Sequence, residues 1–208
     1  GWAKERSGLL IDFIVVALIV GFLLRGRLAN LAEVEVRGLV LAVLAVVVQY
    51  GIQYVDNTAW FDVRPYAAYL YVATLLFLLV VILLNRRSPA IVLMGVGIFL
   101  NFLVIAANGG KMPVSAEGLA RAGMEEYVAI LQSGTVLTHQ LVDEQTRLAF
   151  LADIFAVPEP YPFPRVFSVG DALLGVGAFW FLVGGMTAHP SVTGKRRAVE
   201  LRRVSLRR

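Results

Sequence analysis

Long runs of apolar residues alternate with polar segments along most of the chain. The runs are Leu9–Leu24, Leu39–Val55, Tyr66–Leu84, Ala90–Ala107 and Val169–Thr187. A helix that crosses ~30 Å of hydrocarbon needs roughly 17–25 residues, and these runs lie near that length. The first two runs are short and need flanking residues to complete a span. The pattern therefore predicts an all-α fold, a polytopic membrane bundle of five transmembrane helices that forms one integral membrane domain over residues 1–208.

The composition places the chain in the membrane class. Hydrophobic residues make up 58% of the chain and charged residues only 16%, whereas about a quarter of the residues of a soluble domain are charged. There is no cysteine, so disulfides, thiolate metal sites and iron–sulfur clusters are excluded.

Basic residues are unevenly divided among the polar segments. Arg25–Gly38, Asn85–Pro89 and Ala188–Arg208 carry 12 Lys/Arg and three Glu, whereas Gly1–Ser7, Asp56–Pro65 and Asn108–Ser168 carry seven Lys/Arg and ten Asp/Glu. Basic residues in short loops remain on the cytoplasmic side of a membrane. We therefore expect a bacterial cytoplasmic (inner) membrane protein with its N-terminus and the loop 108–168 outside, and with the basic tail 188–208 in the cytoplasm.

The stretch NGGKMPVSAEGL follows the fourth apolar run directly. Asn108, Gly109 and Gly110 suit the chain reversal at a helix C-terminus, and Pro113 prevents the helix from resuming. An alternative is that the two glycines and Lys111 bind an anion such as a lipid headgroup. The dipole at a helix C-terminus disfavours an anion, so the capping interpretation is preferred and the anion site stays open.

The long loop contains further helical patterns. Residues 116–131 place apolar side chains on one helical face and charged side chains opposite, and residues 139–155 predict a second, shorter amphipathic helix. The segment VPEPYPFPR has alternating prolines and predicts an extended strap, with Tyr161 and Phe163 at headgroup level. Alternatively, this segment is itself a ligand for a proline-binding partner. The sequence SVGD, ending at Asp171, has the spacing of a capping box and predicts the start of the fifth helix.

The segments NFLVIAANGGKMPVS, TRLAFLADIF and YPFPRVFSVGDALLGVG resemble a family of small bacterial multi-spanning membrane proteins of unknown function. Its most characteristic parts are the Asn-Gly-Gly-x-Met-Pro turn and the Ser-Val-Gly-Asp turn, and the similarity extends from roughly Arg25 to Ala188. The resemblance implies the membrane topology and no established activity.

Polar residues within and beside the apolar runs gather toward the expected outer side. The candidate residues of an outer polar pocket or anion site are Asp12, Gln53, Asn101, Asn108, Gly109, Gly110, Lys111 and Asp171. Polar groups inside spans often mark functional sites. Hydrogen bonds between helices would place the same residues there, and this structural interpretation is the preferred one.

The sequence predicts no catalytic residue, no metal site and no cofactor. His139 and His189 lie on opposite sides of the expected membrane and cannot share a metal, and we interpret His139 as a solvated surface residue. Ser115, Ser133 and Thr138 lack the spacing of a nucleophile elbow. No P-loop or dinucleotide-binding fingerprint is present.

The tail GKRRAVELRRVSLRR is expected to lie against the membrane surface. Its candidate contacts to anionic lipid headgroups are Lys195, Arg196, Arg197, Arg202 and Arg203. Each basic residue near an anionic surface contributes about 1 kcal/mol of attraction. Membrane lipids are therefore the expected partners, followed by other membrane subunits, and nucleic acid is not expected. An acidic cytoplasmic partner or ribosomal RNA is kept only as the alternative for the tail.

These observations favour a non-enzymatic structural, scaffolding or accessory membrane protein, for example a small subunit of a larger complex. The alternative is an outer-leaflet lipid-binding protein or lipid-active enzyme with a pocket under the loop 108–168. In that hypothesis Lys111 binds phosphate, and Asp12 or Asp171 performs acid–base chemistry. A transporter ranks third, because the cytoplasmic half of the predicted spans has almost no polar residue to line a path.

The expected orientation can be tested by thiol labelling, because the chain has no cysteine of its own. A cysteine introduced near Met112 should react with a membrane-impermeant maleimide added outside intact cells. Labelling from the cytosolic side alone would show that the orientation is the opposite of the expected one.

Overall fold

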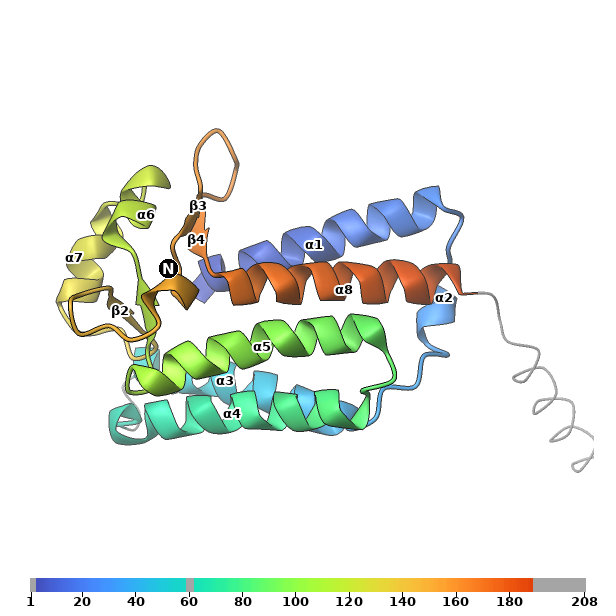
Figure 1. Cartoon of the computed structure of the whole chain (residues 1–208), viewed down its shortest axis with the longest axis horizontal. Helices are drawn as coiled ribbons and strands as arrows, with labels where there is room; N and C mark the ends of the chain where they lie inside the picture. The colour runs from blue at the N-terminus through green and yellow to red at the C-terminus, as the bar shows by residue number, and fades with distance from the viewer. Residues whose placement is uncertain (1–2, 59–61, 189–208) are drawn as a thin grey trace, which may run out of the picture.

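The computed structural model describes residues 3–58 and 62–188, and within these ranges five long helices lie side by side (Figure 1). They are α1 (Ala3–Leu23), α3 (Leu39–Thr58), α4 (Arg64–Leu84), α5 (Pro89–Ala107) and α8 (Val169–Thr187), with the short α2 (Leu28–Leu31) after α1. Each predicted apolar run therefore forms a helix. The basic tail lies outside the described residues, so its lipid contacts stay a prediction.

Among the described residues, three helical segments are long and apolar enough to cross a membrane: Pro65–Leu84, Pro89–Ala107 and Val169–Thr187. Within the parts of α1 and α3 whose side chains the structure describes, the apolar segments are the shorter Leu9–Leu23 and Leu39–Ile52. Three apolar helices are consistent with a membrane protein, and the predicted count of five spans is not confirmed.

The helices leave large apolar side chains on the outside of the bundle. Leu23 is 76% exposed and Leu83 is 68% exposed. Exposure of apolar surface to water costs about 25 cal/mol per Å², whereas lipid tails are as apolar as these side chains. The surface of the bundle is therefore suited to lipid.

Glycines bring α5 and α8 close together at the centre of the bundle. α8 packs against α1 and α5, and α4 packs against α5 and α3. A Cβ atom on Gly97 would collide with the backbone of Gly170 and Leu174. Close approach of this kind supplies the van der Waals contacts that hold helices together in lipid, where apolar burial contributes little.

The two ends of the bundle differ in their polar residues. Residues 108–168, which we term the cap, cover the end at which α5 stops and α8 starts (Figure 1). The turns after α1 and between α4 and α5 lie at the opposite end, which we term the basic end because it carries Arg25, Arg27, Arg37, Arg86 and Arg87. The assignment of the basic end to the cytoplasm stays a prediction.

Short strands and helices make up the cap. In chain order they are β1 (Met112–Val114), α6 (Ala116–Arg121), α7 (Glu126–Gln132), β2 (His139–Leu141), the 3₁₀ helix η1 (Ala149–Leu151), β3 (Phe155–Val157) and β4 (Arg165–Phe167). β1 and β2 pair in parallel, and β3 and β4 form an antiparallel hairpin. The described fold is therefore mostly helical but not all-α, which corrects the predicted class.

Two predicted helices of the loop take other forms. Residues 116–131 form two helices instead of one, because Gly123 adopts a φ of +71° between them. Residues 139–155 were expected to form an amphipathic helix and instead form β2, a turn, η1 and the first residue of β3. Their backbone bonds to β1, for example from the Val142 amide to the Val114 carbonyl at 2.9 Å. This non-local pairing overrides the local helical pattern.

The alternating prolines also have a different role from the predicted strap. Residues 158–164 form the loop of the β3–β4 hairpin, which projects from the bundle in Figure 1. Proline has no backbone N–H to donate. The strand pairing accordingly ends at Val157, before residues 158–164, and begins again at Arg165. The rings of Tyr161 and Phe163 contact each other edge to face with centroids 6.5 Å apart, and their depth in a membrane stays a prediction.

The close approach of α5 and α8 predicts that Gly97→Ala destabilises the protein by about 1–3 kcal/mol, since backbone atoms cannot move aside as a flexible side chain can. Thermal unfolding in detergent would measure the change. Gly51→Ala in α3 is the matched control, because a Cβ at Gly51 meets no atom within 4 Å. The control should be neutral or slightly stabilising, and an equal loss at both positions would contradict the packing argument.

Candidate functional site at the junction of cap and helices

A buried ion pair joins the cap to the first helix. Arg165 of β4 has a side chain that is 3% exposed, and its Nη1 lies 3.0 Å from Oδ2 of Asp12 in α1, whose side chain is 28% exposed. The Arg165 Nε also donates to the Phe163 carbonyl at 2.9 Å. A guanidinium group out of contact with water needs such partners, because desolvation costs several kcal/mol per ion. The pair therefore holds the β3–β4 hairpin on α1.

Tyr161 completes this contact from the loop of the hairpin. The Arg165 guanidinium carbon lies 5.3 Å from the centroid of the Tyr161 ring, within the range of a cation–π contact. Hydrogen bonding to Asp12 raises the pKa of Tyr161, and partial desolvation adds to this effect while Arg165 opposes it. The Asp12 carboxylate therefore favours the protonated form of the phenol.

A second polar cluster lies where α8 begins. The Asp171 amide donates to the Ser168 Oγ at 2.9 Å, and the Ser168 amide donates to the Asp171 Oδ2 at 3.1 Å. These two bonds form the predicted capping box. Asn101 of α5 bonds both residues: its Nδ2 donates to the Asp171 Oδ1 at 2.8 Å, and its Oδ1 accepts from the Ser168 Oγ at 2.9 Å. Asn101 thus connects the two most closely packed helices.

The Asn-Gly-Gly turn forms a third connection. The Asn108 Nδ2 donates to the carbonyls of Val104 and Arg147, and the Asn108 Oδ1 accepts from the Arg147 amide at 2.9 Å. Gly109 and Gly110 take the left-handed conformation with φ of +70° and +87°. Asn108 therefore ends α5 and also ties the later part of the cap to it, as the preferred capping interpretation requires.

The predicted site residues therefore do not converge on a single pocket. Asp12 pairs with Arg165, Asp171 pairs with Asn101, and the Asn108 turn lies apart from both. Gln53 lies in α3, but its side chain is outside the described part of the structure. None of the other seven residues lines the cavity in the cap or the groove at the basic end. Side-chain bonds to other parts of the fold account for the positions of Asp12, Asn101, Asn108 and Asp171. The use of the candidate residues, Lys111 included, as an anion site stays a prediction.

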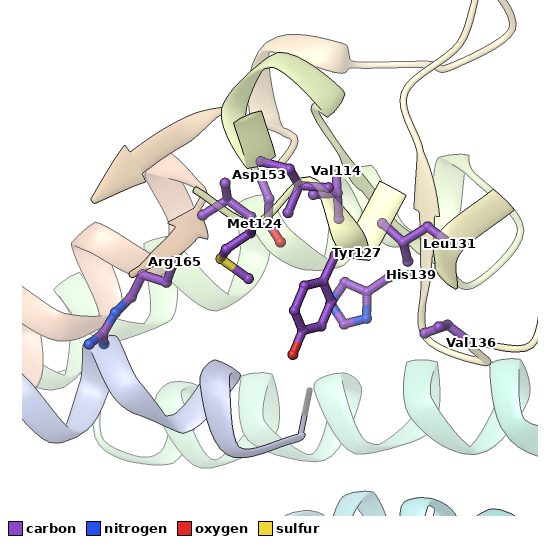
Figure 2. A pocket seen from close by; sticks show the side chains of 10 residues that line it. Val114, Met124, Tyr127, Leu131, Val136, His139, Asp153 and Arg165 are labelled. Atoms are coloured by element: carbon purple, nitrogen blue, oxygen red, sulfur yellow. The ribbon is translucent and has the colours of Figure 1, made fainter. Parts of the chain in front are cut away.

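The cap itself contains a cavity that the sequence analysis did not identify. It has a volume of about 70 Å³, is partly open to the outside, and is lined by residues from the elements of the cap (Figure 2). Its lining residues are Val114, Leu119, Met124, Tyr127, Leu131, Val136, His139, Asp153, Arg165 and Val166. They come from α6, α7 and the strands and turns around them, so only the tertiary fold brings them together. The sequence feature that could have indicated this cavity is the apolar face of residues 119–131, because such a face packs against other apolar residues.

His139 is buried in this cavity wall, which corrects its interpretation as a solvated residue. Only 8% of it is exposed, and its Nδ1 lies 2.9 Å from the Thr138 Oγ1. Asp153 and Arg165 are also buried in the wall, and the Arg165 Nη2 has no hydrogen-bond partner within the described structure. A cavity of ~150 Å³ can hold benzene, so this smaller one has room for a few heavy atoms. Within the described residues, no group of three His, Cys, Asp or Glu side chains could hold a metal ion.

The apolar helices and the hydrogen-bonded cap define the class of this molecule, a membrane-type helical bundle with one capped end. The chain belongs to DUF5317, a family of unknown function whose sequence model matches residues 33–183. It is also similar to an uncharacterized protein of Thermotoga maritima, with 28% identity over 175 residues that cover 84% of this chain and 90% of that protein. No solved structure matches the chain. The family is thus one of unknown function, as the sequence resemblance implied.

The Asp12–Arg165 pair predicts that Asp12→Ala destabilises the cap by about 2–3 kcal/mol, because a buried guanidinium loses its counter-charge. Hydrogen exchange of the cap amides and thermal unfolding in detergent would measure the loss. Glu117→Ala is the control: its pair with Arg121 lies on the cap surface, with side chains 74% and 69% exposed. That pair should contribute less than about 1 kcal/mol, and similar losses in both variants would refute the assigned role of Asp12.

Proposed function

We propose that the protein is a non-enzymatic accessory protein of the membrane. Its apolar helices anchor it in the lipid, and its cap is a rigid surface that binds another membrane subunit on the expected outer side. In this proposal the polar residues at the junction hold the cap in one orientation relative to the helices, so that the cap surface is presented to the partner.

One observation supports this function above the others. Four polar side chains of the predicted site are used in bonds between structural elements: Asp12 with Arg165, Asn101 with Ser168 and Asp171, and Asn108 with Arg147. A catalytic acid or base needs access to a reacting atom, and these groups instead face one another. A cap held at three points loses little further freedom when it binds, which favours affinity for a partner.

The cap surface also carries apolar side chains suited to an interface. Ile130, Phe150, Phe155 and Phe163 are exposed there. Aromatic residues are enriched at protein interfaces because they combine a large apolar area with little conformational freedom. These residues are the proposed contact points.

A second candidate function is the binding of an outer-leaflet lipid or another amphiphile by the cap. The cap cavity favours it, because the cavity is mostly apolar and has the buried guanidinium of Arg165 in its wall. Its volume of about 70 Å³ fits the end of a chain or a small group rather than a whole lipid. The cavity therefore favours lipid binding by the cap, but it does not favour the lipid-active enzyme of the alternative hypothesis.

Photo-crosslinking in membranes of the natural host tests the two candidates. Benzoylphenylalanine in place of Ile130, on α7 at the far side of the cap from the helices (Figure 1), should give a defined protein adduct if the cap binds a subunit. Leu83 on α4 is the matched lipid-facing control and should give lipid adducts alone. A lipid adduct at Ile130 would favour the second candidate. The same pattern at both positions would contradict the accessory function.

A further inference from the structure

We propose that the basic end carries a binding site for a phosphate group, supplied either by a lipid headgroup or by a soluble phosphorylated compound. The site is a groove between the segment that precedes α3 and the turn that joins α4 to α5. It lies at the opposite end of the bundle from the cap (Figure 1), and it is independent of the function proposed for the cap.

The groove is large enough for a headgroup. Its volume is about 430 Å³, which lies within the range of ~300–1,000 Å³ typical of small-molecule sites. Arg37, Arg86 and Arg87 line it, together with the single carboxylate of Glu35. Three guanidinium groups against one carboxylate leave an excess of positive charge. None of these arginines forms an ion pair with the described residues.

A buried asparagine holds the two sides of the groove together. Asn85 is 8% exposed, and its Oδ1 accepts from the Arg37 amide at 2.9 Å while its Nδ2 donates to the Arg37 carbonyl at 2.7 Å. The same Nδ2 also donates to the Val81 carbonyl at 2.7 Å. These bonds fix the backbone of Arg37 beside the turn that carries Arg86 and Arg87. The three arginines therefore line the same groove without any ligand, although like charges repel one another.

Arginine side chains suit phosphate in particular. The guanidinium group is planar and presents a fork of N–H donors that bonds two phosphate oxygens at once. The start of α5, with the Ser88 hydroxyl as its N-cap, forms part of the same groove. Its helix dipole favours an anion there, and this adds to the effect of the arginines.

The remaining wall of the groove is apolar and favours a lipid as the source of the phosphate. Val34, Leu84, Ile91 and Phe181 supply this wall. Leu84 is also among the large side chains exposed on the outside of the bundle. A lipid can therefore place its headgroup among the arginines and its first methylene groups along the apolar wall.

The proposal is tested with the purified full-length protein in detergent and two probes, dioleoylphosphatidylglycerol and inorganic phosphate. Native mass spectrometry would count retained lipid, and thermal unfolding would report phosphate binding. Arg86→Gln/Arg87→Gln should weaken binding of the effective probe by about tenfold or more, because two charge-assisted contacts are lost. Arg25→Gln/Arg27→Gln is the matched control, since it removes two exposed arginines from the same end outside the groove and should change binding by less than about twofold.

The two probes separate the possible sources of the phosphate. Retained lipid without a response to millimolar phosphate assigns the site to a headgroup, and a response to phosphate alone assigns it to a soluble compound. Equal losses in the two double variants, or binding of neither probe by the unaltered protein, would overturn the proposal. The basic tail is the same in all variants, so its own lipid contacts cancel in the comparison.

Two single substitutions keep the test informative if the double variant fails to fold. Glu35→Gln removes the only carboxylate among the described residues that line the groove and should tighten binding by about twofold to fivefold, whereas a general loss of structure would weaken it. Arg37→Gln should weaken binding by about threefold to tenfold. A Glu35→Gln variant that folds and binds more weakly would overturn the proposal.

Discussion

The structure of the capped end depends on the need of a buried guanidinium group for a counter-charge. Arg165 is drawn out of water by the packing of the β3–β4 hairpin, and the carboxylate that compensates it comes from a helix more than 150 positions earlier in the sequence. Because a buried charge tolerates few alternative arrangements, this one contact sets where the hairpin lies on α1. The hairpin in turn encloses one side of the cap cavity, and its last strand leads directly into α8.

The two ends of the bundle use polar residues in opposite ways. At the capped end, Asp12, Asn101 and Asn108 each bond a residue from another element, so their polar groups stabilise the fold. At the basic end, Asn85 is bonded in the same manner, but the arginines around it form no ion pair within the described chain. Polar groups that bond one another, as at the capped end, indicate a structural role. Arginines that lie together without an ion-pair partner among the described residues, as at the basic end, indicate a binding site for an anionic ligand. This contrast is the physical basis for proposing a protein-binding cap and a phosphate-binding groove in one small molecule.

Local features of the sequence predicted their structures well. Each apolar run became a helix, the Ser168–Asp171 capping box starts α8, and the glycines after Asn108 take the left-handed conformation. These features depend on residues within a few positions of one another. The cap was predicted less well: residues 139–155 have a helical pattern but pair with β1, and His139 is buried although it looks like a surface residue in the sequence. Of the candidate polar residues, Asp12, Asn101, Asn108 and Asp171 bond within or beside the capped end. The partners Arg165 and Arg147 were not identified, because no local pattern connects them to these residues.

The sequence by itself determined that this chain forms apolar helices, where their ends lie, and which turns carry the excess of basic residues. Periodicity, capping and charge depend on residues that are close together in the sequence. Only the tertiary structure decided that the long loop contains two small sheets, that Asp12 compensates Arg165, and that Asn85 brings Arg37 to the turn of Arg86 and Arg87. The physical reason is that strand pairing and the burial of charge depend on groups far apart in the chain, and their energies exist only once folding has brought those groups together.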